Sequence, residues 1–150
     1  HRTLNIRNTM FTLIDEGVVP VINENDSVSV DEIKIGDNDT LAALTATLWN
    51  ADLMIILSDI DGVFDSDPKS NSNAKLIETV GNAEKLFGSI DIGGTSSFGT
   101  GGISSKIEAA AKVNQYGIPM ILLNGKKNDI IRNCITGTSK GTLFTGRIEK

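Results

Sequence analysis

LMIILSDIDG, residues 53–62, is the stretch that decides the fold of this chain. Its first five residues are apolar without interruption, a pattern typical of a strand that is buried on both faces of a parallel sheet. Polar residues follow at once, and in open parallel sheets binding sites form beyond the carboxyl ends of the strands. The stretch therefore predicts a central strand with a site at its end.

Helix and strand patterns alternate on both sides of this stretch. Before it we expect a helix that Gly17 ends, a buried strand, a second β-like piece and an alanine-rich helix, over residues 4–14, 18–22, 28–35 and 41–49. After it we expect two weaker elements, a helix and a buried strand, over residues 74–80, 83–90, 104–116 and 118–123. A short helix through about Cys134 and a glycine-rich tail come last. This order predicts an α/β layered fold with a mainly parallel sheet in one domain.

The composition is that of an ordinary soluble domain, with 39% hydrophobic and 22% charged residues among 150. A net charge of -5 leaves no basic field for a phosphate backbone, so nucleic acid is not expected as a partner. The one cysteine, Cys134, has no partner for a disulfide or a zinc site, which favours a reducing compartment. No apolar run approaches the roughly 18 residues of a membrane span, and the start lacks the apolar core of a signal peptide. We therefore expect a cytoplasmic protein that uses no membrane.

Two clusters of carboxylates and amides follow separate β-like segments. The first is Asn23-Glu24-Asn25-Asp26 and the second is Asp37-Asn38-Asp39. Carboxylates suit an ammonium group or a metal-bound water, whereas amides and the helix N-terminus after Asp39 suit a carboxylate. The pair could therefore hold an amino acid by both ends. Turns and a helix cap explain either cluster taken alone.

A glycine-rich run leads into the helix predicted over residues 104–116. Residues 99–106 read GTGGISSK, so backbone amides precede a helix that opens with two serines and Lys106. Amides at a helix N-terminus bind phosphate, and lysine adds a mobile positive charge. The run does not match the P-loop pattern GxxxxGK[ST], because no glycine stands directly before Lys106. A phosphate site and a flexible loop with a solvated lysine both fit the pattern.

The polar end of residues 53–62 also admits another class of enzyme. An apolar strand followed by DxDGV is how the nucleophile motif of haloacid-dehalogenase-type phosphatases looks, with Asp59 as nucleophile and Asp61 as the acid. Against this, the motif lies in mid-chain and leads into DSDPK, residues 65–69, rather than into a clear cap or helix. The phosphatase interpretation rests on analogy alone.

Taken together and in this order, the segments closely resemble the glutamate 5-kinase branch of the amino acid kinase family. The matching pieces are VPVINEND, KIGDND, SDIDGV, GTGGISSK and GTLF, at residues 19–26, 34–39, 58–63, 99–106 and 141–144. The pairing of NEND with GDND is the specific part. Other amino acid kinases, such as acetylglutamate kinase, aspartokinase and uridylate kinase, share the SDxDGV and GTGG pieces more loosely.

The resemblance implies a three-layer αβα sandwich in which Mg-ATP phosphorylates the side-chain carboxylate of L-glutamate to L-glutamyl 5-phosphate, the first step of proline synthesis. It implies that Lys106 stabilises the transferring phosphoryl group and that Asp39 positions lysine ammonium groups. The residues implied to contact glutamate are Asn23, Asp26, Asp37 and Asn38. Those implied to line the nucleotide are Ser58, Asp59, Thr100, Gly101, Gly102, Ile103, Ser104, Ser105 and Lys106. Feedback inhibition by proline and a homo-oligomer are further family expectations.

The chemistry of the residues agrees with this reaction. The side chain of glutamate has a pKa of about 4.3 and is ionised at neutral pH, so that no general base is needed. The obstacle is repulsion between that carboxylate and the ATP phosphates, which alignment and positive charge overcome. Lys106 and the glycine amides can supply both, whereas His1, alone and terminal, is no catalytic candidate.

Members of the family carry an amino-terminal half with a second phosphate-binding lysine and a Gly-Ser loop, and nothing before His1 supplies them. We therefore expect residues 1–150 to be the carboxyl-terminal portion of a kinase domain, without kinase activity of their own. Two further functions stay open. One is that of an amino acid kinase with a different acceptor, of the acetylglutamate kinase or aspartokinase type, and the second is that of a non-catalytic module that binds an amino acid or a nucleotide.

Overall fold

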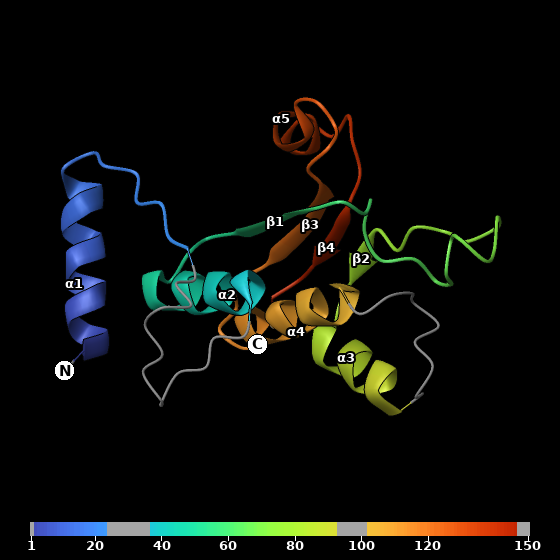
Figure 1. Ribbon diagram of the computed structural model, residues 1–150, viewed down its shortest axis with the longest axis horizontal. Coiled ribbons are helices and arrows are strands. Elements are labelled where there is room, and N and C mark those ends of the chain that lie inside the picture. Colours follow the sequence, from blue (N-terminus) through green and yellow to red (C-terminus); the bar gives the residue numbers. More distant parts are fainter. Residues whose placement is uncertain (1, 24–36, 93–101, 147–150) are drawn as a thin grey trace.

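The computed structural model of the chain describes residues 2–23, 37–92 and 102–146, drawn in colour in Figure 1. A β-like piece predicted over residues 28–35 lies outside the described residues, as do all but the last residue of the glycine-rich run 93–102. None of the helices in the described ranges has the length and apolar character that crossing a membrane requires.

The described strands form one sheet in the order β1-β3-β4-β2. They are β1 (Met54–Ser58), β2 (Thr79–Val80), β3 (Met120–Asn124) and β4 (Thr142–Phe144). β1 is parallel to β3 and β2 is parallel to β4, while β3 and β4 are antiparallel. The prediction of a mainly parallel sheet is confirmed. Ser58 pairs with Asn124, so β1 and β3 end side by side.

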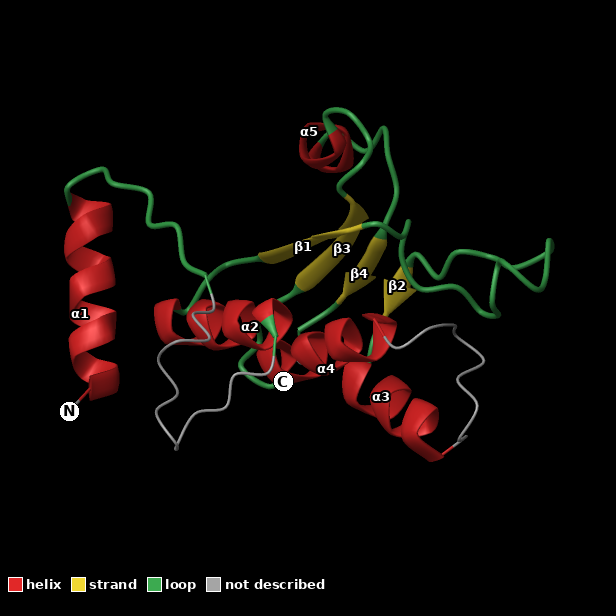
Figure 2. Cartoon of the chain, in the orientation of Figure 1, coloured by secondary structure: helices red, strands yellow, loops and turns green. Residues whose placement is uncertain are grey.

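The described helices are α1 (Arg2–Asp15), α2 (Asn38–Trp49), α3 (Ala83–Ile92), α4 (Gly102–Asn114) and α5 (Ile130–Ile135). Figure 2 shows α2, α3 and α4 beneath one face of the sheet and α5 on the other side, beyond the end of β3. Successive side chains of a strand point to opposite faces, so the fully buried Leu122 and Leu123 of β3 serve the two sides. Helix, sheet and helix therefore form the three layers expected of an α/β sandwich.

The core lies between the sheet and α4. Ile107, Ala110 and Val113 recur at the spacing of one helical face and are fully buried. They belong to one apolar cluster with Met120 and Phe144 of the sheet. This packing fixes the place of α4 against the sheet, and with it the place of Lys106 near the N-terminus of the helix.

The strand predicted over residues 18–22 is wrong. The segment is irregular, and Val19 and Val21 are 84% and 95% exposed. An apolar, β-branched run forms a strand only where a neighbouring strand takes up its backbone hydrogen bonds and side chains, and β1 at the sheet edge pairs with β3 alone in the described part. The segment has the composition of a strand, but within the described residues no neighbouring strand pairs with it.

Two other boundaries differ from the sequence-based expectation. The tail at residues 141–144 holds a strand, β4, in which Thr142 and Phe144 are fully buried. A strand of three residues is too short to show an alternating pattern. The helix expected from residue 41 begins at Asn38, because the side chain of Asp37 accepts a hydrogen bond from the Thr40 amide and so caps the helix.

Candidate active site

A cleft of about 360 Å³ opens at the carboxyl edge of β1 and β3. Its walls are the polar end of β1 with the loop behind it, the last residue of β3 and the first turns of α4. The two strands end there because they are parallel and in register, and the N-terminal end of α4 lies at the same edge. This is the place where open parallel sheets bind ligands.

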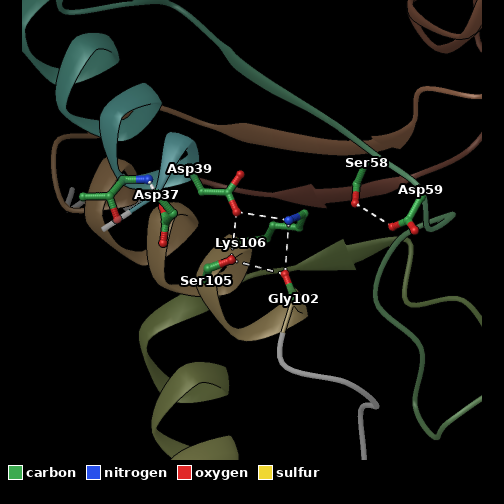
Figure 3. Close-up of polar contacts among 8 residues, drawn as sticks. Asp37, Asp39, Ser58, Asp59, Gly102, Ser105 and Lys106 are labelled. Carbon is green, nitrogen blue, oxygen red and sulfur yellow. Dashed lines mark hydrogen bonds and ion pairs between the residues drawn. The ribbon is translucent and has the colours of Figure 1, made fainter. Parts of the chain in front are cut away.

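Lys106 is the cation at the α4 side of the cleft. Its side chain is 15% exposed, and its Nζ lies 3.0 Å from Asp39 Oδ2 and 3.1 Å from the carbonyl oxygen of Gly102. Helical side chains point back toward the N-terminus of their helix, which brings this ammonium to the end where backbone amides are free of helical partners. The charge of the Lys106 ammonium and the positive end of the α4 dipole therefore act at the same place, near which Lys106 lies in Figure 3.

Asp39 comes from the first turn of α2, beside α4. Its Oδ2 also accepts a hydrogen bond of 2.8 Å from the Ser105 hydroxyl, and its side chain is 18% exposed. Asp37, two residues earlier, uses its carboxylate to cap α2. The two aspartates of one motif thus have separate tasks, one within its own helix and one across to the lysine.

The end of β1 supplies Ser58 and Asp59 to the opposite wall of the cleft. The Ser58 hydroxyl donates a hydrogen bond of 3.4 Å to Asp59 Oδ1. Asp59 is 71% exposed and lies 4.0 Å from the ammonium of Lys126, a distance at which screening leaves little attraction. Figure 3 shows this pair across from Lys106, and all three residues line the cleft.

Asp61 is tied more firmly than Asp59. Its Oδ1 accepts hydrogen bonds from the Lys127 ammonium at 2.7 Å and from the Asn124 amide at 2.8 Å. These two hydrogen bonds hold the pKa of the Asp61 carboxyl below its ordinary value, and the bond from Lys127 has a larger effect than the bond from Asn124. An ionised carboxylate therefore bridges the loop after β1 to the loop after β3.

Gly62 fixes the path of the chain behind Asp61. Its φ is +150°, and a Cβ there would stand 2.5 Å from Thr142 Oγ1. That hydroxyl accepts a hydrogen bond from the Val63 amide and donates one to the Ile77 carbonyl oxygen, each of 2.8 Å. Only glycine fits this close approach, and Gly62 is itself one of the residues that line the cleft.

Residues 1–124 match the profile of the amino acid kinase family. The chain belongs to that family. This finding overturns the haloacid-dehalogenase interpretation of Asp59 and Asp61, because the DxDG motif lies within the matched residues. A strand followed by paired aspartates recurs on unrelated folds, and the motif alone could not separate them.

Curated members of the amino acid kinase family resemble the chain along nearly its whole length. It is 62% identical over 144 residues to the glutamate 5-kinase of Alkaliphilus metalliredigens, covering 96% of the chain and 54% of that protein. It is 48% identical to the glutamate 5-kinase of Clostridium acetobutylicum, covering 95% and 54%. The chain therefore spans about half the length of these relatives.

Solved structures of amino acid kinase proteins share the fold. The UMP kinase of Bacillus anthracis superposes with a TM-score of 0.63 at 20% identity, over 93% of this chain and 51% of that one. An isopentenyl phosphate kinase superposes with a TM-score of 0.64 at 24% identity, over 91% and 52%. The α/β sandwich is thus the amino acid kinase fold, as the sequence predicted.

The structure brings together most of the residues predicted for the nucleotide. Ser58, Asp59, Gly102, Ile103 and Lys106 line the same cleft. Ser105 is adjacent to the cleft, because its hydroxyl donates a hydrogen bond to Asp39, the partner of Lys106. Ser104 lies in the first turn of α4. Thr100 and Gly101 lie outside the described residues.

The residues predicted for glutamate are placed less completely. Asn23 and Asn38 line a second hollow of about 440 Å³ between α2 and β1, whose other lining residues are mostly apolar, and Asn23 is exposed. Asp37 caps α2, and Asp26 lies outside the described residues. A joint site for an amino acid stays a prediction.

Asn124 and Phe64 are cleft residues that sequence reasoning did not assign. Asn124 stands directly after a predicted parallel strand, so the rule that sites form at strand ends could have found it. Phe64 has the sequence context of a residue that packs within a loop, and it lines the cleft instead. A lone aromatic residue in a loop carries no pattern that marks it as part of a site.

Proposed function

We propose that the protein carrying this chain is a glutamate 5-kinase, which uses Mg-ATP to phosphorylate the side-chain carboxylate of L-glutamate and forms L-glutamyl 5-phosphate, the first step of proline biosynthesis. The observation that carries the proposal is the 62% identity to a glutamate 5-kinase over 96% of the chain. The paired Lys106 and Asp39 at the edge of the cleft support it, since they supply what phosphoryl transfer to a carboxylate requires.

Lys106 has the position of the group that stabilises the phosphoryl group in transit. Phosphoryl transfer spreads negative charge over the equatorial oxygens, and a preorganised cation stabilises that charge without rearranging during the reaction. The Lys106 ammonium is held by Asp39 and by the Gly102 carbonyl oxygen, so it stays at the α4 N-terminus before any ligand arrives. We assign it the main catalytic role.

Asp39 positions that ammonium without acting as a base. The acceptor carboxylate of glutamate is ionised at neutral pH and has no proton to give up. The site must align the glutamate carboxylate with the phosphates of ATP, and positive charge held between these two anionic groups reduces their repulsion. We assign Asn23, Asp26, Asp37 and Asn38 to the binding of glutamate, and residues 58–59 and 100–106 to the nucleotide.

Mg²⁺ fits this chain as a companion of ATP. In the described ranges, no three or more His, Cys, Asp or Glu side chains are grouped so that they could hold a metal. Mg²⁺ in kinase sites is usually bound by one or two carboxylates and by the phosphates of the substrate, which the scattered Asp59, Asp61 and Asp67 of the cleft suit. The ion would neutralise phosphate charge, while Lys106 and the α4 amides orient the phosphates.

We further propose a cytoplasmic homo-oligomer with proline as a feedback inhibitor. Residues 1–150 are proposed to be a portion of one amino acid kinase domain, in view of the 54% of the relatives' length that they cover. These points rest on the similarity to glutamate 5-kinases and on no contact in the described residues.

The decisive experiment measures ADP release by the protein as its gene encodes it, with L-glutamate, N-acetylglutamate and L-aspartate offered in turn. ADP release that needs both L-glutamate and Mg²⁺, with an acyl phosphate trapped by hydroxylamine, supports the proposal. Turnover with another acceptor instead assigns a different amino acid kinase. Ligand-induced thermal stabilisation without turnover indicates a non-catalytic binding module.

A further inference from the structure

The hydroxyl of Ser105 is bonded to the protein at a point where its neighbours face the cleft. Gly102, Ile103 and Lys106 of the same helix line the cleft. Ser105 is not among the lining residues in the described part of the chain. Its hydroxyl donates a hydrogen bond of 2.8 Å to Asp39 Oδ2, from α4 across to α2. The side chain of Ser105 therefore serves the partner of Lys106.

Ser105 and Lys106 converge on one oxygen atom. Asp39 Oδ2 accepts the hydrogen bond of the Ser105 hydroxyl and, at 3.0 Å, that of the Lys106 ammonium. The Gly102 carbonyl oxygen lies 3.2 Å from the same hydroxyl and 3.1 Å from the same ammonium. A hydroxyl has one hydrogen to donate, and the shorter bond, to the charged acceptor, is the stronger. Figure 3 shows these groups joined in a closed ring.

The carboxylate of Asp39 needs a second donor to keep one orientation. The terminal torsion of an aspartate side chain is broad, so an ion pair alone leaves the carboxylate free to rotate. Ser105 restricts that rotation, because its backbone belongs to the packed helix α4. The side chains of Asp39 and Lys106 are 18% and 15% exposed, so water competes little for these bonds. The direction of the Lys106 ammonium therefore depends on Ser105 through Asp39.

We propose that Ser105 is a positioning residue for phosphoryl transfer, whose hydroxyl fixes the carboxylate of Asp39 and thereby the ammonium of Lys106. The hydroxyl acts through the aspartate and does not contact the nucleotide. A contact between the backbone amide of residue 105 and a phosphate is compatible with this role, because amide and hydroxyl are separate donors. The effect on turnover rests on the proposed kinase activity, whereas the coupling to Asp39 and Lys106 does not.

Steady-state kinetics of the protein as encoded test the role in turnover. Ser105→Ala is expected to lower kcat about fivefold and to leave the KM for ATP unchanged, because the ammonium is less well placed and no nucleotide contact is lost. Alanine favours a helix, so the backbone of α4 is kept. Ser105→Thr keeps a hydroxyl and is expected to restore most of the lost kcat. Thr47→Ala is the matched control and should leave kcat unchanged, because the Thr47 hydroxyl donates a bond of 2.9 Å within α2, to the Ala43 carbonyl oxygen.

A second set of variants asks whether Ser105 acts through Asp39. In an Asp39→Ala background, Ser105→Ala is expected to cause no further loss of kcat, whereas independent roles would multiply the two losses. A raised KM for ATP in Ser105→Ala, or a loss of kcat that persists in the Asp39→Ala background, overturns the inference. So do an unchanged kcat in Ser105→Ala and a Ser105→Thr variant that is no faster than Ser105→Ala.

Stability measurements separate this inference from the proposed function. The coupling energy between Asp39 and Lys106, measured by urea denaturation, is expected to fall to about half in a Ser105→Ala background. An unchanged coupling contradicts the inference, whichever reaction the protein catalyses. Wild-type protein that phosphorylates no acceptor, with a coupling that depends on Ser105, contradicts only the proposed function and leaves the positioning of Lys106 by Ser105 in place.

Discussion

Two of the lysine–aspartate pairs at the cleft are close enough to be hydrogen-bonded, and these two differ in burial. Lys106 and Asp39 are 15% and 18% exposed, whereas Lys127 and Asp61 are 49% and 41% exposed. Their N–O distances are nearly equal, at 3.0 and 2.7 Å. Solvent screens the second pair and screens the first much less, so similar geometry carries different energies. We expect the buried pair to decide catalysis and stability and the exposed pair to tune binding.

The largest expected effect is that of Lys106→Ala on turnover. Removing a preorganised cation from the transferring phosphoryl group is expected to lower kcat by about 10²–10³-fold, with a much smaller change in the KM for glutamate. Steady-state kinetics of the protein as encoded measure both. Lys112→Ala on the same helix, where the ammonium is 46% exposed, is the control and should leave kcat unchanged. Asp26→Ala is expected to raise the KM for glutamate and to change kcat little. If Lys106→Ala instead raised the KM for glutamate and left kcat normal, both role assignments would be reversed.

The next effect is on stability. Asp39→Asn leaves the Lys106 ammonium without its partner in a site that is mostly shielded from water, and we expect a loss of about 1–3 kcal/mol in the free energy of unfolding. Urea denaturation measures this loss. Glu108→Gln, which breaks the exposed pair with Lys112 on the same helix, should change it by less than about 0.5 kcal/mol. Equal losses in the two variants would show that burial does not separate these pairs.

A double-mutant cycle compares the two cleft pairs directly. The coupling energy between Lys106 and Asp39 is expected to exceed that between Lys127 and Asp61, which should lie below about 1 kcal/mol because both partners are more than one-third exposed. Raising the salt concentration to about 1 M should reduce the second coupling more than the first. A coupling of Lys127 to Asp61 that is larger and insensitive to salt would contradict the assigned order.

The smallest effect is the pH dependence from Asp61. Because the folded pKa lies below the unfolded value of about 3.9, its stabilising contribution is present above that pH and is lost as the pH falls through the folded pKa. Wild-type protein should therefore lose more stability on acidification below about pH 4 than Asp61→Asn, by less than about 1 kcal/mol. Denaturation midpoints at about pH 5 and about pH 3 test this. Asp65, whose pKa is also lowered, contributes in the same direction, so the comparison is repeated in an Asp65→Asn background.

Much of the candidate site could be predicted from local pattern. The strand at residues 53–57, the helix from residue 104 and the strand at 118–123 all have counterparts in β1, α4 and β3. From these, the place of the site at the carboxyl ends of the strands follows by a general rule. The glycines and Lys106 around the start of this helix pointed to a phosphate site, and of these residues Gly102 and Lys106 line the cleft.

The failures have a common physical cause. Residues 18–22 have the composition of a strand and are exposed, while residues 142–144 have no strand pattern and lie inside the sheet. In both cases the outcome depends on whether another strand lies alongside. A β-strand forms only where another strand pairs with it, and its own residues do not determine which strand that is.

Neighbouring residues along the chain determined the helices, the two strands β1 and β3 and the chemical kind of the site, because periodicity and capping act over a few residues. Which charges meet was decided only when the chain folded. Asp39 and Lys106 are 67 positions apart, and Asp61 and Asn124 are 63 apart. Their contacts depend on the packing of α2 against α4 and on the register of β1 with β3, so a polar residue acquires its task from the element that lies opposite it.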